Sequence, residues 1–198
     1  MTTLTIATRN AHKTREIREL LGQACKVRDL STLPAMPVIS EDGTTLAENA
    51  TLKALGIARL VDGLILADDS GLEVDLLGGA PGVFSARYAG ADATDQQNIE
   101  KLLKEWQNRA TSGSDRPAAR FRCVMVLARA GEFICAVEGV VEGTIVDPPR
   151  GLGGFGYDPV FQPVGYDRTF GELPAEIKNQ ISHRARAIEK VREFLLLA

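Results

Sequence analysis

The chain has 198 residues, 44% hydrophobic and 25% charged, a composition typical of one globular domain over residues 1–198 rather than of a disordered chain or a coiled coil. Its longest apolar run, residues 123–128, is too short to cross a bilayer, and the N-terminus lacks the pattern of a secretory signal. A net charge of −3 disfavours nucleic acid as a partner, and three cysteines without a C-x-x-C pair disfavour disulfides or zinc and favour a reducing cytoplasm.

Apolar periodicity predicts both strands and helices along the chain. A strand over residues 3–8, a polar loop and a helix over 13–21 form the opening half of an α/β unit. The further expected elements are helices over 46–61, 94–109 and 183–197, a strand over 64–67, and strands over 120–129 and 132–145 joined by a hairpin turn at Ala130-Gly131.

One glycine-rich segment, residues 151–156, matches the G-x-G-x-x-G pattern of dinucleotide-binding sites. Such a site needs a strand before the pattern and a helix after it. Two prolines precede this segment, and Pro159 keeps Asp158 out of the helical region of backbone space. We therefore reject a dinucleotide site. The chain also has no G-x-x-x-x-G-K-[ST] motif, no G-x-S-x-G motif and only two histidines, which disfavours P-loop and serine-hydrolase chemistry.

The polar loop between the first strand and helix is the first candidate site. Its residues are Thr8, Arg9, Asn10, Ala11, His12 and Lys13. Amides at a helix start, an asparagine side chain and a lysine can together hold an anion. The alternative is a capped surface helix with solvated basic residues.

Two neighbouring acids, Asp68 and Asp69, follow the expected strand 64–67 and precede Ser70. Strand alternation sends them to opposite faces, so only one heads a site. A carboxylate at the carboxyl end of a strand is well placed for Mg²⁺ and for activating water, and Glu41 in an acidic turn could supply a second ligand. The alternative for this polar run is an ordinary turn.

Two further candidates lie in the last third of the chain. The loop Phe155-Gly156-Tyr157-Asp158 could stack an aromatic ring on a flat base while its carboxylate accepts hydrogen bonds; the alternative is an aromatic plug under a loop. Lys178 precedes Ser182-His183-Arg184, where cations at a helix start oppose the helix dipole. Such a broken local rule often marks function, although solvated basic residues are the alternative. The four candidates together suit a nucleoside polyphosphate with Mg²⁺.

The chain resembles the inosine triphosphate pyrophosphatase family in motifs spread over nearly its whole length. These are Thr8-x-Asn10-x-x-Lys13; Glu48-Asn49-Ala50 with Lys53; Ala67–Leu72; Leu77–Gly82 with Ser85–Tyr88; Gly153–Pro159; and Ser182-His183-Arg184. The resemblance implies an α/β fold with a long mixed β-sheet flanked by helices, two lobes with the active site in the cleft between them, and a homodimer.

The same resemblance implies an activity and residue roles. The activity is Mg²⁺-dependent hydrolysis of ITP, dITP and XTP to the monophosphate and pyrophosphate, which cleanses the nucleotide pool. Asp69 would be the acidic catalytic residue and a metal ligand, and Glu41 the other metal ligand. The phosphates would be held by Thr8, Arg9, Asn10, Ala11, His12 and Lys13, with Ser70 and Lys178 nearby and Lys53 facing the phosphates from its helix. The base would be read by Phe155, Gly156, Tyr157, Asp158, His183 and Arg184.

Two points stay open at this stage. Members of the family often have glycine where this chain has Arg9, so Arg9 either faces solvent or adds a phosphate contact. A non-catalytic purine nucleotide-binding regulatory module would keep the base loop and basic residues, but it would not need Asp69 and Glu41 together. Their joint presence favours an enzyme.

Overall fold

The computed structural model describes residues 3–23, 25–34, 36–110 and 116–197. The chain divides into two compact units. Unit 1 comprises residues 1–69, 123–139 and 183–198, and unit 2 comprises residues 70–122 and 140–182. Three strands have residues in both units: β3 (Leu64–Val74), β4 (Ala118–Arg129) and β5 (Glu132–Ile145). The assignment of residues 1–198 to one domain stays a prediction.

The described residues form a mixed sheet of six strands, in the order β2-β1-β3-β4-β5-β6. The short strands are β1 (Thr3–Ile6), β2 (Lys26–Asp29) and β6 (Phe161–Pro163). Strand β1 runs parallel to β2 and β3, with Leu4 opposite Leu64, whereas β6 is antiparallel to β5, with Phe161 opposite Ile145. Parallel neighbours need a crossover connection, and a helix supplies it between β1 and β2. The α/β class and the mixed sheet flanked by helices are therefore confirmed.

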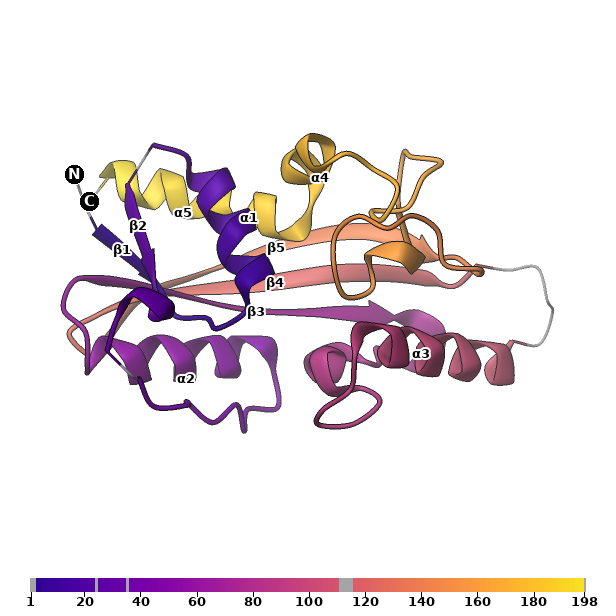
Figure 1. Ribbon diagram of the computed structural model, residues 1–198, viewed down its shortest axis with the longest axis horizontal. Helices are drawn as coiled ribbons and strands as arrows, with labels where there is room; N and C mark the ends of the chain where they lie inside the picture. Colours follow the sequence, from indigo (N-terminus) through magenta and orange to yellow (C-terminus); the bar gives the residue numbers. More distant parts are fainter. Residues whose placement is uncertain (1–2, 24, 35, 111–115, 198) are drawn as a thin grey trace. The chain divides into compact units, whose positions relative to one another are not determined.

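Unit 1 has helices on both faces of its part of the sheet (Figure 1). Helices α1 (Ala11–Leu21) and α5 (His183–Leu197) cover one face and contact each other, while α2 (Leu46–Ala58) covers the other. The core under α1 and α5 joins Ile17 and Ile188 to strand residues such as Leu66. These helices present apolar residues at helical spacing, so one face of each is buried and the other is solvated.

Unit 2 has its own core, rich in aromatic rings. Its helices are α3 (Asp95–Arg109) and α4 (Ala175–Ile181). Phe161 packs against Phe121 and Phe170, with ring centroids 4.6 and 5.3 Å away. The remaining helical segments among the described residues are short 3₁₀ helices: Leu30–Thr32 in unit 1, and Asp75–Leu77, Gly82–Arg87 and Asp158–Val160 in unit 2.

Several expected elements are confirmed with small shifts at their ends. Thr94 caps α3 in a capping box with Gln97, and β5 has the bounds expected from its pattern. Ala130 and Gly131 both take positive φ, of 51° and 80°, as the central residues of a type I′ hairpin turn do. Helix α2 ends three residues earlier than expected, with Arg59 as its C-cap.

The placement of Asp68 and Asp69 at the end of a strand is wrong. Strand β3 continues through both residues and Ser70 to Val74, so the acids lie in its middle. Leu72 and Val74 are fully buried further along the strand and favour its extension. A turn over residues 68–71, the alternative interpretation of this polar segment, is excluded as well.

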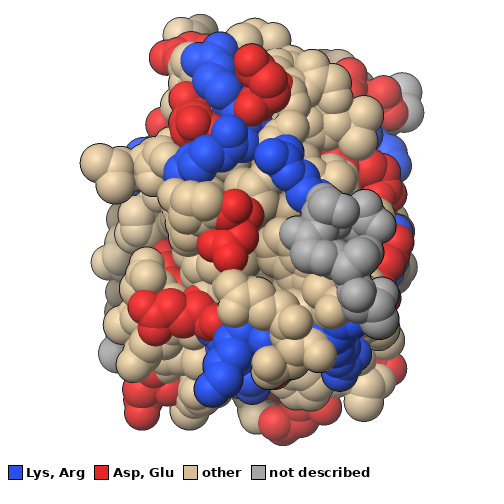
Figure 2. Space-filling view, turned by 90° about the vertical axis from the view of Figure 1, so that its right-hand side faces the viewer, with Lys and Arg blue, Asp and Glu red and all other residues tan. Residues whose placement is uncertain are grey.

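Charged groups of both signs are interspersed on the face drawn in Figure 2. In unit 2, Arg120 forms ion pairs with Glu73, Asp75 and Glu142, and Arg122 pairs with Glu73.

Within the described ranges, no helix is long and apolar enough to cross a membrane.

Candidate active site

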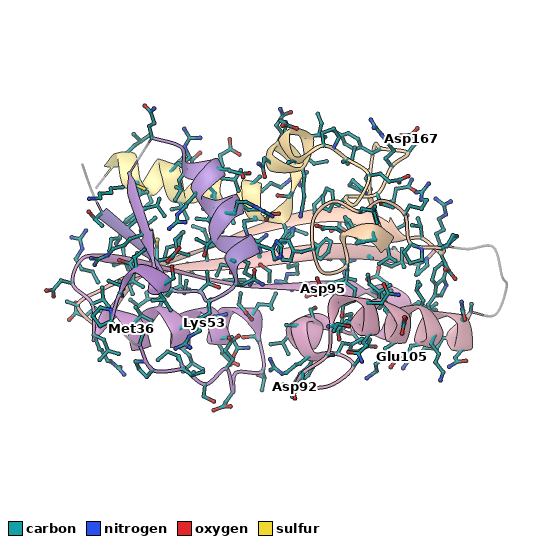
Figure 3. The ribbon with its side chains drawn as sticks, viewed as in Figure 1. Met36, Lys53, Asp92, Asp95, Glu105 and Asp167 are labelled. Atoms are coloured by element: carbon teal, nitrogen blue, oxygen red, sulfur yellow. The ribbon has the colours of Figure 1, made fainter. Side chains whose placement is uncertain are left out.

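The two acids of β3 meet different helices of unit 1, as strand alternation predicts. The Asp68 carboxylate lies 2.8 Å from Lys13 Nζ of α1 and 3.0 Å from Arg184 Nη2 of α5. Asp69 lies 2.7 Å from Nζ of Lys53, which is on α2 (Figure 3). Each carboxylate is therefore matched to a cation on the face of the sheet that it points to.

Asp68, whose side chain is fully buried, is the centre of a charge network. Arg184 also donates from Nη1 to Glu16 Oε2 at 2.6 Å, and Cys123 Sγ donates to Asp68 at 3.5 Å. Burial raises the pKa of Asp68, but Lys13 and Arg184 outweigh it and hold that pKa well below its usual value. Burial likewise lowers the pKa of Arg184, and the charge of Asp68 more than reverses this effect. The network explains why a cation is tolerated at the start of α5.

Asp69 belongs to a second, partly open group with Lys53 and Glu41. Lys53 Nζ lies 3.1 Å from Glu41 Oε2, and the side-chain exposures are 38% for Glu41, 12% for Lys53 and 10% for Asp69. Burial raises the pKa of Asp69 despite the opposing charge of Lys53. Burial disfavours charged Lys53, but the nearby carboxylates, Asp69 foremost, raise its pKa overall. A buried carboxylate with a raised pKa beside the more exposed Glu41 suits a general base.

This second group fits a divalent cation. Two carboxylates converge on one ammonium, so their oxygens are already placed to share a positive charge. Among residues 3–23, 25–34, 36–110 and 116–197, no cluster of three or more His, Cys, Asp or Glu could hold a metal by itself. Mg²⁺ is usually bound by one or two carboxylates together with substrate phosphates and water. Glu41 and Asp69 therefore suit an ion that arrives with a phosphorylated substrate.

The loop before α1 is arranged as a capped helix start. Thr8 Oγ1 accepts from the Asn10 amide at 3.2 Å, and Asn10 Oδ1 accepts from the Lys13 amide at 3.1 Å. Ala11 is the exposed first residue of α1, and His12 contacts Arg15 at 3.2 Å. The local structure is therefore a capped helix, which was the alternative interpretation of this loop. Its anion-binding role stays a prediction.

Arg9 bonds to the backbone in a way that the sequence did not specify. Its Nη2 donates to the carbonyl of Met36 at 2.5 Å. Thr8, Arg9 and Met36 help to line a pocket of about 490 Å³ beside α1. Arg9 therefore ties the loop before α1 to the segment that leads to Glu41.

The aromatic loop of unit 2 is held by Asp158 and Lys178. Lys178 Nζ lies 2.5 Å from Asp158 Oδ2, which also accepts from the Phe155 amide at 2.8 Å. The ammonium also lies 4.9 Å from the centre of the Phe155 ring. Tyr157 donates to the carbonyl of Ser85 at 2.9 Å. These contacts leave Phe155 half-buried, whereas both charged side chains are buried. Asp158 and Lys178 thus support the loop.

The structure groups the expected residues within each unit. Unit 1 brings together Glu41, Lys53 and Asp69, and it places Lys13 and Arg184 on Asp68. His183 is buried at the start of α5. Unit 2 holds Ser70, Lys178 and the loop Phe155–Asp158. The base- and phosphate-binding roles of these residues stay predictions.

Sequence reasoning missed two residues that contact the expected ones. Glu16 pairs with Arg184, and its position three residues after Lys13 places both on one face of α1, which is a usable signal. Asp95, at the start of α3 (Figure 3), accepts from the Gly156 amide at 2.7 Å. No local pattern in the sequence points to this second contact.

Comparison with known proteins identifies relatives over the whole length. A sequence profile of the Ham1 family matches residues 4–194. The dITP/XTP pyrophosphatase of Geobacillus kaustophilus is 46% identical over 194 residues, which cover 98% of this chain and 94% of that protein. The Bacillus subtilis dITP/XTP pyrophosphatase is 45% identical, covering 96% and 95%.

Comparison with solved structures also identifies similar proteins over nearly the whole chain. A HAM1 protein from Coxiella burnetii matches with a TM-score of 0.88 and 40% identity over 100% of both chains. The dITP/XTP pyrophosphatase of Mycobacterium abscessus matches with a TM-score of 0.74 and 35% identity, covering 96% of this chain and 98% of that one. The resemblance found in the sequence motifs is confirmed, and the chain belongs to the Ham1 family.

Proposed function

We propose that this protein hydrolyses non-standard purine nucleoside triphosphates, ITP, dITP and XTP, to the monophosphate and pyrophosphate with the help of Mg²⁺. The observation that carries the proposal is the convergence of Glu41 and Asp69 on Lys53, in a chain whose relatives include dITP/XTP pyrophosphatases. Oxygen ligands for a metal, a carboxylate that can accept a proton and a lysine that offsets phosphate charge all assist phosphoryl transfer.

In the proposed reaction, a water oxygen bonds to the α-phosphorus while the bond from that phosphorus to the bridging oxygen breaks. Pyrophosphate leaves, and Asp69 accepts the proton that the water loses. When bound to Glu41 and Asp69, Mg²⁺ would supply charge stabilisation on phosphate oxygens and acidify water. Lys53 and Lys13 add positive charge toward the phosphates. Because phosphoryl transfer depends mainly on positioning and charge, no covalent nucleophile is needed.

We assign base recognition to the loop Phe155–Asp158 of unit 2. The half-buried Phe155 ring offers a stacking surface, while Lys178 supports the ring through a contact of 4.9 Å. Ring stacking is tolerant of base identity. The choice of non-standard purines must therefore come from polar groups that read the base edge.

The alternative, a non-catalytic nucleotide-binding module, is not favoured, because it gives no reason for Glu41 and Asp69 to share one lysine.

The family resemblance also supports a homodimer, which light scattering after size-exclusion chromatography would test. Cys25, Cys123 and Cys135 form no disulfide, which agrees with the proposed cytoplasmic location.

The proposal is tested by incubating the protein with ITP in ¹⁸O-labelled water, with and without Mg²⁺. Pyrophosphate should form only with Mg²⁺, and the label should enter the monophosphate. Label in orthophosphate, with a diphosphate left behind, would refute attack at the α-phosphorus. Nucleotide binding without any hydrolysis would favour the regulatory module.

A further inference from the structure

Three side chains of α2 hold the loop that carries Glu41. Lys53 Nζ contacts Glu41 itself at 3.1 Å. One turn earlier, Asn49 Oδ1 accepts from the Gly43 amide at 2.8 Å. Before it, Glu48 accepts from the Thr44 amide at 2.6 Å and closes the capping box at the start of the helix. The loop is thus attached to one rigid helix at three successive points.

Asn49 is the least expected of the three. It is 0% exposed, and asparagine is a poor helix former that costs energy to bury. Its Nδ2 has no hydrogen-bond partner among the residues that the structure describes. Neither helix propensity nor apolar packing therefore accounts for this residue. Among the described residues, the Gly43 amide is the one hydrogen-bond partner of the Asn49 side chain, so the loop contact accounts for an asparagine at this position.

Gly43 is adapted to the same contact. A Cβ atom at this position would lie 2.7 Å from Asn49 Oδ1 and 2.7 Å from the Glu48 Cβ. No real Cβ sits that close to its neighbours, so any larger residue would push the loop away from α2. The close approach fixes the backbone two residues after Glu41.

The helix geometry links this contact to the acidic pair. Asn49 and Lys53 are four residues apart and lie on the same face of α2. Lys53 also contacts Asp69, so one helix face sets the position of Gly43 relative to both carboxylates. We propose that Asn49 is a positioning residue for the divalent cation: by holding Gly43, it keeps the Glu41 carboxylate beside that of Asp69. This inference rests on the proposed function.

The test measures cation binding directly. Mn²⁺ binding to the full-length protein, in the presence of a non-hydrolysable α,β-methylene analogue of ITP, is followed by electron paramagnetic resonance. We expect Asn49→Ala to raise the Kd for Mn²⁺ about 10–100-fold, the range typical for loss of a group that orients a metal ligand. Gly43→Ala, which leaves Asn49 itself intact, should weaken binding in the same way.

Asn98 offers a matched control. It is also a buried helical asparagine, 2% exposed, and its Oδ1 accepts from a loop amide, that of Ala89, at 2.8 Å. Asn98→Ala should lower the melting temperature, as Asn49→Ala does, without changing the Kd for Mn²⁺. High Mg²⁺ should also restore the ITP turnover of Asn49→Ala, which it would not do if the variant were merely misfolded.

The outcomes separate this inference from the function on which it rests. If the wild type binds Mn²⁺ and Asn49→Ala binds it with the same Kd, the positioning role is wrong and the proposed function stands. An equal loss of Mn²⁺ affinity in Asn98→Ala would also overturn the role, since the effect would then be general destabilisation. A wild type that binds no Mn²⁺ with the analogue overturns both.

Discussion

The two units hold their candidate residues by different physical means. In unit 1 the residues are charged and are fixed by ion pairs from three helices to the middle of one strand. In unit 2 the backbone amides of the aromatic loop donate to Asp158 and Asp95, Lys178 forms a buried ion pair with Asp158, and a Cβ atom at the neighbouring Gly154 would collide with that carboxylate. Unit 1 should therefore be sensitive to removal of charge, and unit 2 to addition of a Cβ atom.

The largest effect that this comparison predicts is on catalysis in unit 1. Asp69→Asn keeps the size of the side chain and an oxygen that can accept from Lys53, but it removes the charge and the base. Loss of general-base function alone lowers the rate by ~10²–10⁴-fold, and loss of a metal ligand adds to this. Steady-state pyrophosphate release from ITP measures the loss, and circular dichroism checks that the fold is kept. Turnover near the wild-type rate would contradict the assignment of Asp69 as general base and metal ligand.

Removal of Arg184 from the network around Asp68 should cause the largest loss of stability. Arg184→Ala removes the guanidinium that pairs with Glu16 and leaves Lys13 as the remaining cation on Asp68, and breaking a buried ion pair in this way costs about 3–5 kcal/mol. Urea unfolding measures this free energy. A loss below about 1 kcal/mol would show that the network contributes little.

The same variant tests the predicted reading of the base by Arg184. If Arg184 recognises the 6-oxo group, kcat/KM for ITP should fall more than kcat/KM for ATP. An equal fall for both substrates would show that the guanidinium, which Asp68 and Glu16 engage, is a structural or phosphate-binding group instead.

In unit 2, a single methyl group should be enough to disturb the loop. Gly154 has a φ of +73°, and a Cβ there would collide with the Asp158 carboxylate. We expect Gly154→Ala to raise KM for ITP severalfold, because the Phe155 ring loses its support, while Mn²⁺ affinity in unit 1 stays unchanged. Gly156→Ala is a useful control, since that glycine has a similar φ of +60° but open space around it. Equal effects would point to backbone strain rather than to the collision.

The pH dependence of stability gives a smaller, directional test of unit 1. The folded-state pKa of Asp68 is lowered, so its stabilising contribution is present above its unfolded pKa of about 3.9 and is lost as the pH falls toward the folded value. Asp68→Asn should therefore lower the melting temperature most at neutral pH, with a difference from the wild type that narrows below about pH 4. A constant difference across this range would contradict the assignment.

Local patterns predicted local structure well. The hairpin at Ala130-Gly131 and the cap at Thr94 depend on neighbours in sequence, and both are present. The continuation of β3 through Asp68 was not predicted, because two adjacent acids are typical of a turn when their ion-pair partners are unknown. Those partners are remote: Arg184 lies 116 residues from Asp68 and 168 from Glu16.

The candidate site shows the same division between features that local sequence patterns predict and contacts that depend on the folded structure. Motifs identified Asp69, Glu41 and Lys53 by their chemistry, and the structure brings these three together. The supporting contact from Asn49 to Gly43 could not be predicted, because it depends on how closely a loop approaches a helix. A residue type alone does not reveal such an approach.

The central claim is that Glu41 and Asp69 together hold the cation used in pyrophosphate release. Titration of that activity with Mg²⁺, for the wild type and for Glu41→Gln, tests it most directly. Glutamine keeps the shape of the side chain but not its charge, so the Mg²⁺ concentration for half-maximal release should rise by about tenfold or more, comparable to other losses at a metal site. Superimposable titration curves would contradict the account.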